Sequence, residues 1–438
     1  MNPGDALIAP PPLAAARPAA PLEAVDALLP GGLRVVAARR ATAPVVQLRL
    51  GVPFGGTEPG HAALAELLAC TLLKGTDSRS RDAIDEELAA VGGTLKAVVG
   101  PEHLKITGQV LAPGLPRLLA VLADCLTAAA YPTAVLEAER ERLLHRIRLT
   151  ESMPARAARA ALLRHCFGDH PATRETPGAA EVSAADPAAV AELHRTALVP
   201  RGSALVLVGD LQPHRLVEEL AGALGDWRSD RAAVAMAPLP APAHRGQPAL
   251  HVPSPGARQC EARLAAPSLP LTDPGYPALA LADQVFGGYF SSRLVQRLRE
   301  REGWIYTGQS AIEQRTGSAL GTVQFASAQQ HSEAALAGTL AELAALAGPQ
   351  PPTTEEIASA RGYALGLQSL VLSTQKGLAD SLYGPVLAGL PADWPERLTA
   401  ALRAVPDEEV RAAAAAHLRP EAYTAVLLGP STAPTPTP

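Results

Sequence analysis

The chain has 438 residues and a formal net charge of −5, with 38 Lys and Arg residues against 43 Asp and Glu residues. This near balance lacks the basic stripe typical of nucleic-acid-binding proteins and the polybasic segment typical of membrane-surface anchors, so we expect neither nucleic acid nor a membrane as a partner. Hydrophobic residues make up 47% of the chain and aromatic residues only 3%, which predicts a large core built from Ala, Leu and Val.

The sequence favours a soluble cytoplasmic protein. No apolar run is long enough for a transmembrane helix, and prolines interrupt every apolar stretch near the N-terminus, which argues against a signal peptide. The four cysteines form no Cys-x-x-Cys pair, and we expect them to be free, buried thiols in a reducing compartment.

Composition divides the chain into five segments. Residues 1–21 are rich in Pro and Ala, residues 431–438 form a similar tail, and we expect both to be disordered. A Pro-rich linker, residues 236–248, separates an N-terminal domain (22–235) from a C-terminal domain (249–430).

The two halves begin in the same way. Residues 33–52 and 249–265 alternate as extended, hairpin-like segments, and each is followed by a Gly/Pro turn and an apolar helix. These helices begin near His61 and Pro277, which are 216 residues apart. Strands followed by long helices in each half predict two α+β domains.

The two halves also end in the same way. The apolar segments SALVLVGD and YTAVLLGP read as short buried strands running into Gly209 and Gly429, which are 220 residues apart. Nearly constant offsets predict a duplicated domain. Helix starts are marked in both halves, by Asp186 before a proline and by a capping box from Thr353 to Glu356.

Several motifs, in order, resemble the M16 (pitrilysin/insulinase-like) peptidases. The first half contains GVPFGGTEPGHAALAELLACTLLKGT, AIDEELAAVGGTLKA, FGDHP and SALVLVGDL, and the second contains FGGYFSSRLVQRLREREGWIYTGQS. The resemblance covers about residues 30–430. It implies two homologous domains of the M16 peptidase (LuxS/MPP-like) type, joined by the Pro-rich linker.

The resemblance also locates a degenerate zinc motif. In the family, His-x-x-Glu-His supplies two zinc ligands and the general base, and a distant Glu is the third ligand. Aligned on the Lys-Gly-Thr segment, these motif positions hold Glu66, Ala69 and Cys70. The third-ligand position, about 76 residues further on, holds Arg146, whose guanidinium would repel a dication. We therefore expect no metal and no catalytic residue in this chain.

Three histidines lie near these motifs without the required spacing. His61 is five residues before Glu66, and we expect it at the turn that leads into the helix. His165 and His170 flank a glycine, and a structural or surface role is expected for them. A rebuilt metal site of Glu66, Cys70 and a nearby His is a further interpretation of the same residues.

The second half keeps a pair that the resemblance implies is functional. Arg299 and Tyr306 match an Arg and a Tyr that face the zinc across a chamber and contact substrate in M16 enzymes. A Tyr hydroxyl can donate to a developing oxyanion, and an Arg can hold a carbonyl or carboxylate. On these two residues alone, a solvated Arg and a packed Tyr are the favoured interpretation; the surrounding segments that resemble the family favour the functional one.

Together these features predict a catalytically inactive subunit of a heterodimer. Its partner would be a zinc-binding M16 peptidase subunit, and its substrate an unfolded peptide, for example a leader peptide. Two alternatives remain at this stage: a scaffold or peptide-binding protein of the M16 fold, and a peptidase with the rebuilt metal site.

Overall fold

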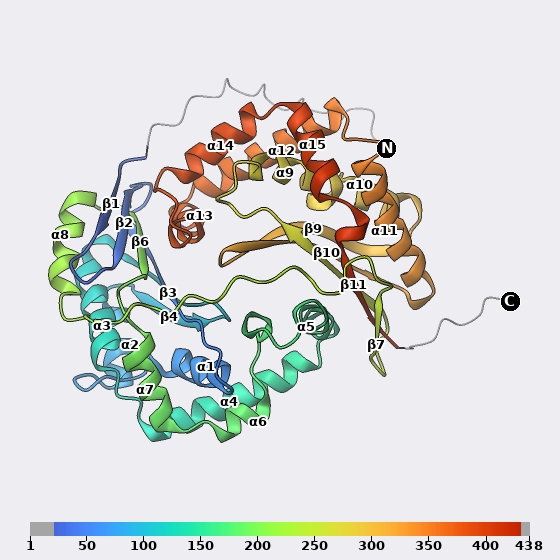
Figure 1. The fold of residues 1–438 in the computed structure, drawn as a ribbon. Helices are drawn as coiled ribbons and strands as arrows, with labels where there is room; N and C mark the ends of the chain where they lie inside the picture. Colours follow the sequence, from blue (N-terminus) through green and yellow to red (C-terminus); the bar gives the residue numbers. More distant parts are fainter. Residues whose placement is uncertain (1–21, 431–438) are drawn as a thin grey trace, which may run out of the picture.

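The computed structural model describes residues 22–430, which form two sheets with their helices, one in each half of the chain (Figure 1). The segments 1–21 and 431–438, for which the sequence predicts disorder, lie outside the described residues.

The first sheet has six strands in the order β1-β2-β6-β3-β5-β4. Strand β6 lies parallel to β2 and antiparallel to β3, and all of its residues are buried, in keeping with its central place. The strands are β1 (Ala24–Leu28), β2 (Arg34–Arg39), β3 (Val45–Pro53), β4 (Thr94–Val99), β5 (His103–Leu111) and β6 (Ala204–Gly209).

The second sheet repeats this plan with five strands in the order β7-β11-β8-β10-β9. Here β11 lies parallel to β7 and antiparallel to β8, as β6 does to β2 and β3. The strands are β7 (Leu250–Pro253), β8 (Cys260–Ser268), β9 (Ile305–Arg315), β10 (Ser318–Ser327) and β11 (Thr424–Gly429). The matching order and direction support the predicted duplication.

One expectation about the strands is wrong. The opening segment of each half is not a hairpin, because the last strand of that half lies between its two strands, β6 between β2 and β3 and β11 between β7 and β8. The physical reason is burial. A strand that is buried along its whole length needs hydrogen-bond partners for its backbone N–H and C=O groups, and a neighbouring strand on each edge supplies them.

Helices cover both sheets, and the predicted start signals act as expected. The side chain of Asp186 accepts a hydrogen bond from the Ala188 amide at 2.9 Å, and Thr353 and Glu356 form a capping box. The first-half helices are α1 (His61–Thr71), α2 (Arg81–Ala90), α3 (Leu115–Ala128), α4 (Thr133–Glu151), α5 (Pro154–Phe167), α6 (Ala179–Ala184), α7 (Pro187–Ala197) and α8 (Pro213–Ala223).

In the second half, the first helix is followed directly by a π-helical turn that contains the Gly-Gly pair. The helices are α9 (Tyr276–Asp283), η3 (Gln284–Gly288), α10 (Arg293–Val295), η4 (Gln296–Arg301), α11 (Ser332–Ala347), α12 (Thr354–Leu372), α13 (Gln375–Leu387), α14 (Trp394–Ala404) and α15 (Asp407–His417). Short 3-10 turns are η1 (Ala112–Gly114), η2 (Pro171–Thr173), η5 (Gln329–His331) and η6 (Pro420–Ala422).

The two halves exchange one helix each, so that α5 and α13 lie between the sheets (Figure 1). Helix α5 packs on β8 and β11 through a cluster that includes Leu162, Leu163 and Val426. Helix α13 packs on β3 and β6, with Leu382 among its buried side chains. Each fully buried aliphatic side chain contributes about 1.5–3 kcal/mol, so each half helps to stabilise the other.

The Pro-rich linker is packed against this centre. Met236 and Leu239 belong to the α5 cluster, and the Ala243 amide donates to the Cys166 carbonyl oxygen at 2.9 Å. All four cysteines are free as predicted; three are buried and Cys70 is half-buried. Within residues 22–430, no helix is both long and apolar enough to cross a membrane.

Candidate functional site

Helices α1 and α4 bring three of the four degenerate zinc-motif residues into contact. Glu66 and Cys70 lie one turn apart on the same face of α1, and Arg146 reaches them from α4. The Arg146 Nη2 atom is 2.7 Å from Glu66 Oε2 and 3.8 Å from Cys70 Sγ. The guanidinium thus lies between the two side chains that stand at the family's histidine positions.

The charge states of this cluster follow from its burial. Burial raises the pKa of Glu66 above its ordinary value, and the Arg146 guanidinium limits that rise. Burial also raises the pKa of the Cys70 thiol, so the thiolate that would bind a metal is disfavoured. Ala69 is buried in the core and has no group that could act as a base.

A second carboxylate near this cluster is held by two other cations. Glu139 is buried on α4, and its carboxylate forms ion pairs with Lys74 and Arg142. Lys74 comes from the Lys-Gly-Thr segment after α1, so the ion pair ties that segment to α4. The negative charge of Glu139 is therefore balanced by Lys74 and Arg142.

The three histidines near the motifs have structural roles. His61 is the first residue of α1, and its Nε2 donates to the Phe54 carbonyl oxygen at 3.1 Å. His170 Nδ1 accepts from the Ala172 amide at 3.2 Å. The His165 ring stacks on His244 with centroids 4.1 Å apart. Among the residues that the structure describes, no three His, Cys, Asp or Glu side chains are placed to share a metal ion.

Arg299 and Tyr306 lie in the other half, on either side of a tight turn. Arg299 is on η4, Tyr306 is the second residue of β9, and Gly303 takes a positive φ of 65° between them. Tyr306 is 77% exposed, so it is not a packed core tyrosine. Neighbouring Trp304 packs partly against the core of this half, beside Gly338.

The Arg299 side chain has two neighbours, the carboxylate of Glu300 and the ring of Phe290. Its Nε lies 3.6 Å from Glu300 Oε1, and both side chains are about 40% exposed. Its guanidinium carbon lies 5.1 Å from the centroid of the Phe290 ring. Among the described residues, no hydrogen bond or ion pair joins Arg299 or Tyr306 to the α1–α4 cluster.

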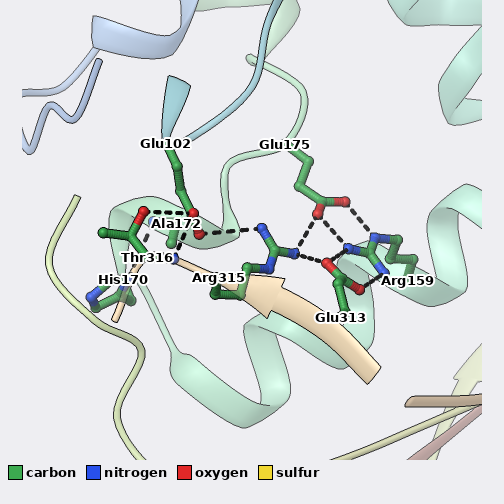
Figure 2. A network of polar contacts seen from close by, with 8 residues as sticks. All are labelled: Glu102, Arg159, His170, Ala172, Glu175, Glu313, Arg315 and Thr316. Atoms are coloured by element: carbon green, nitrogen blue, oxygen red, sulfur yellow. Dashed lines mark hydrogen bonds and ion pairs between the residues drawn. The ribbon is translucent and has the colours of Figure 1, made fainter. Parts of the chain in front are cut away.

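An ion network that the sequence did not reveal joins the two halves (Figure 2). Arg159 of α5 binds Glu175 through two contacts of 2.6 Å and Glu313 of β9 at 2.7 and 3.0 Å. Arg315 also reaches Glu175, at 2.9 Å. Burial acts to raise the pKa of Glu175, but the hydrogen bonds and charges of the two arginines outweigh it and lower that pKa below its ordinary value.

The same network includes the tip of the β4–β5 hairpin. Glu102 Oε2 accepts from both the amide and the hydroxyl of Thr316 at 2.8 Å, and Arg315 Nη1 lies 3.6 Å from Glu102 Oε1 (Figure 2). Arg315 is only 7% exposed. Arg315 is the last residue of β9 and Thr316 follows it, so the network holds the far end of the strand that carries Tyr306.

Family models match most of the chain. Residues 34–179 match Insulinase (Peptidase family M16), and residues 184–362 match the Peptidase M16 inactive domain. An uncharacterised zinc protease of Mycobacterium tuberculosis is 30% identical over 307 residues, which are 68% of this chain and 69% of the relative. The chain belongs to the M16 peptidase family. Another uncharacterised zinc protease, from Streptomyces coelicolor, is 27% identical over 64% of this chain and 62% of its own length.

Solved structures show the same fold. An M16 inactive domain from Pseudomonas fluorescens superposes with a TM-score of 0.85 and 21% identity, covering 95% of this chain and all of that one. A protease from Helicobacter pylori gives 0.84 and 14%, covering 93% of this chain and all of that one.

Against the M16 pattern, the residues of the α1–α4 cluster do not fit zinc. A zinc site needs three donor ligands and an open position for water. Here a permanently charged guanidinium contacts both Glu66 and Cys70, burial raises the pKa of the Cys70 thiol and so disfavours the thiolate, and Ala69 offers no base. The side chains at these four positions therefore differ in chemistry from the ligands and base of the family's zinc motif.

Proposed function

We propose that this chain is the non-catalytic subunit of a two-subunit M16 peptidase, and that a zinc-bearing M16 partner performs the hydrolysis. The observation that carries the proposal is the ion pair between Arg146 and Glu66, because it places a fixed positive charge where a zinc peptidase of this family needs its metal. The zinc would then belong to the partner alone.

The exposed pair in the second half supports a contribution to substrate binding. Tyr306 is 77% exposed, and the Arg299 side chain has only a 3.6 Å contact with Glu300 and a cation–π contact with Phe290. The Tyr306 hydroxyl would donate to the oxyanion that forms on the scissile carbonyl, and Arg299 would bind a backbone carbonyl or terminal carboxylate of the peptide. We propose an unfolded peptide, such as a leader peptide, as the substrate and the cytoplasm as the compartment.

The experiment uses the complex reconstituted from this chain and a zinc-bearing M16 protein of the same organism. With an unstructured fluorogenic peptide, Tyr306→Phe is expected to lower kcat by about 10²-fold, the usual loss for one oxyanion donor, while the two subunits still associate. Arg299→Ala is expected to raise KM. Tyr363→Phe is the matched control. It removes a tyrosine hydroxyl from the same half of the chain but keeps the ring that stacks on Tyr289.

Two results would sink this proposal. Wild-type turnover by both variants would remove the assigned roles of Arg299 and Tyr306. Failure of the chain to associate with any zinc-bearing M16 partner would instead favour a scaffold or peptide-binding protein of the same fold.

A further inference from the structure

Exposed aromatic side chains of this protein gather in one region. The chain has few aromatic residues (5 Phe, 7 Tyr and 3 Trp). Among the described residues, the strongly exposed aromatics are Tyr306 at 77%, Phe290 at 61% and Tyr363 at 43%. Tyr306 and Phe290 flank the η4 segment, and Tyr363 of α12 stacks on Tyr289, next to Phe290, with ring centroids 5.1 Å apart.

The backbone conformation at Tyr289 and Phe290 directs the Phe290 side chain toward solvent. Tyr289 is extended (φ −148°, ψ 174°), so its side chain and that of Phe290 point to opposite sides. The Tyr289 ring packs on Tyr363, which leaves Phe290 facing outward. The Ser292 amide donates to the Tyr289 carbonyl oxygen at 3.1 Å and closes the turn. The turn thus directs the Phe290 ring toward solvent.

Phe290 also sets the position of the Arg299 guanidinium. The 5.1 Å separation between the guanidinium carbon and the ring centroid is a cation–π contact. A ring orients a guanidinium without using its N–H donors, whereas a close carboxylate would occupy them. The Glu300 contact is longer and exposed, so the donors of Arg299 remain available.

We propose that Phe290 is a specificity-determining residue that binds a large aliphatic or aromatic side chain of the substrate peptide. That side chain would lie beside the peptide group bound by Arg299. This inference rests on the proposed function and extends it from an unfolded peptide to a peptide with an apolar residue at one position. Covering one face of the ring with a Leu side chain buries about half of that side chain, which corresponds to about a 5- to 10-fold preference in kcat/KM.

The test uses the complex with its zinc-bearing partner and a set of fluorogenic peptides in which a single Leu is moved through a Ser/Gly host. The wild-type complex is expected to prefer Leu at one position, Phe290→Ala to lose that preference, and Phe290→Tyr to keep it. Leu28→Ala, which truncates a 72%-exposed side chain in the other half, is the control and should keep it as well.

Two outcomes would overturn the inference. Equal loss of kcat/KM for every peptide would mean that Phe290 only positions Arg299. Weaker association of the subunits in Phe290→Ala would mean that Phe290 contacts the partner protein.

If no partner yields an active complex, the proposed function fails, but the peptide site can still be measured. The full chain alone is then titrated with a fluorescein-labelled Leu peptide and its Ser counterpart. Tighter binding of the Leu peptide that disappears in Phe290→Ala supports the inference, and equal binding of the two peptides overturns it.

Discussion

Replacement of Arg146 by Met should destabilise the protein in a way that depends on Glu66 and on pH. The Glu66 side chain is only 20% exposed, and its carboxylate lies 2.7 Å from the Arg146 guanidinium. Two charges at about 4 Å interact by ~4 kcal/mol at an effective dielectric constant of 20. Since Arg146 is 55% exposed, solvent screening reduces this, and we expect a loss of about 1–2 kcal/mol at pH 7.

The sign of the pH dependence follows from the raised pKa of Glu66. A carboxyl whose pKa is higher in the folded state binds protons more tightly when folded, so its contribution to stability falls as the pH rises from the unfolded pKa through the folded one. Replacing Arg146 removes the positive charge and the hydrogen bond that oppose the effect of burial, so the pKa of Glu66 in the folded protein increases further. The deficit of Arg146→Met should therefore be largest at pH 7–8 and shrink as the pH falls through the folded pKa of Glu66, because protonation of the carboxyl removes the charge that pairs with Arg146.

A double-mutant cycle measured by urea unfolding at pH 4 and pH 8 tests this prediction. In a Glu66→Gln background, Arg146→Met is expected to cost little, which gives a coupling of about 1–2 kcal/mol at pH 8. Arg195→Met is the control, because the Arg195–Glu192 pair is exposed on both sides and should change stability by less than about 0.5 kcal/mol. Equal losses in both backgrounds at both pH values would refute the account of the cluster.

Two further predictions concern the metal site and the ion network. The fourfold variant Glu66→His, Ala69→Glu, Cys70→His and Arg146→Glu restores the family's ligands and base, and elemental analysis should find about one zinc per chain; the threefold variant that retains Arg146 is the control and should bind far less. Glu313→Gln leaves Arg159 and Arg315 with Glu175 as their shared partner, so the unfolding free energy should fall by about 1–2 kcal/mol and lose part of its salt dependence, whereas Glu219→Gln, in an exposed pair on α8, should have almost no effect. An unchanged midpoint for Glu313→Gln would show that the network adds no stability.

Features set by local chemistry or by family spacing could be predicted from the sequence. The strands that end at Gly209 and Gly429 and the helix starts at Asp186 and Thr353 depend on residues close in the chain. The approach of Arg146 to Cys70, across 76 residues, was found only because the resemblance supplied that spacing.

Features that depend on packing between distant segments could not be predicted. Arg159 and Glu313 are 154 residues apart, and no periodicity marks them as partners. The exchange of α5 and α13 could not be predicted either, because the apolar face of a helix does not indicate which of the two sheets it packs on. Phe290 lies inside a segment that resembles the family, but its outward direction depends on the stacking of Tyr289 on Tyr363.

If this chain lacks catalysis of its own and completes a zinc-bearing partner, peptide hydrolysis should depend on the ratio of the two chains. The most direct measurement titrates this chain, after its zinc content has been determined, into a fixed concentration of the partner while peptide hydrolysis is followed. The account predicts no zinc and no hydrolysis by this chain alone, with activity that rises to a plateau at one chain per partner. Stoichiometric zinc and hydrolysis by the isolated chain, or partner activity that does not change on titration, would contradict it.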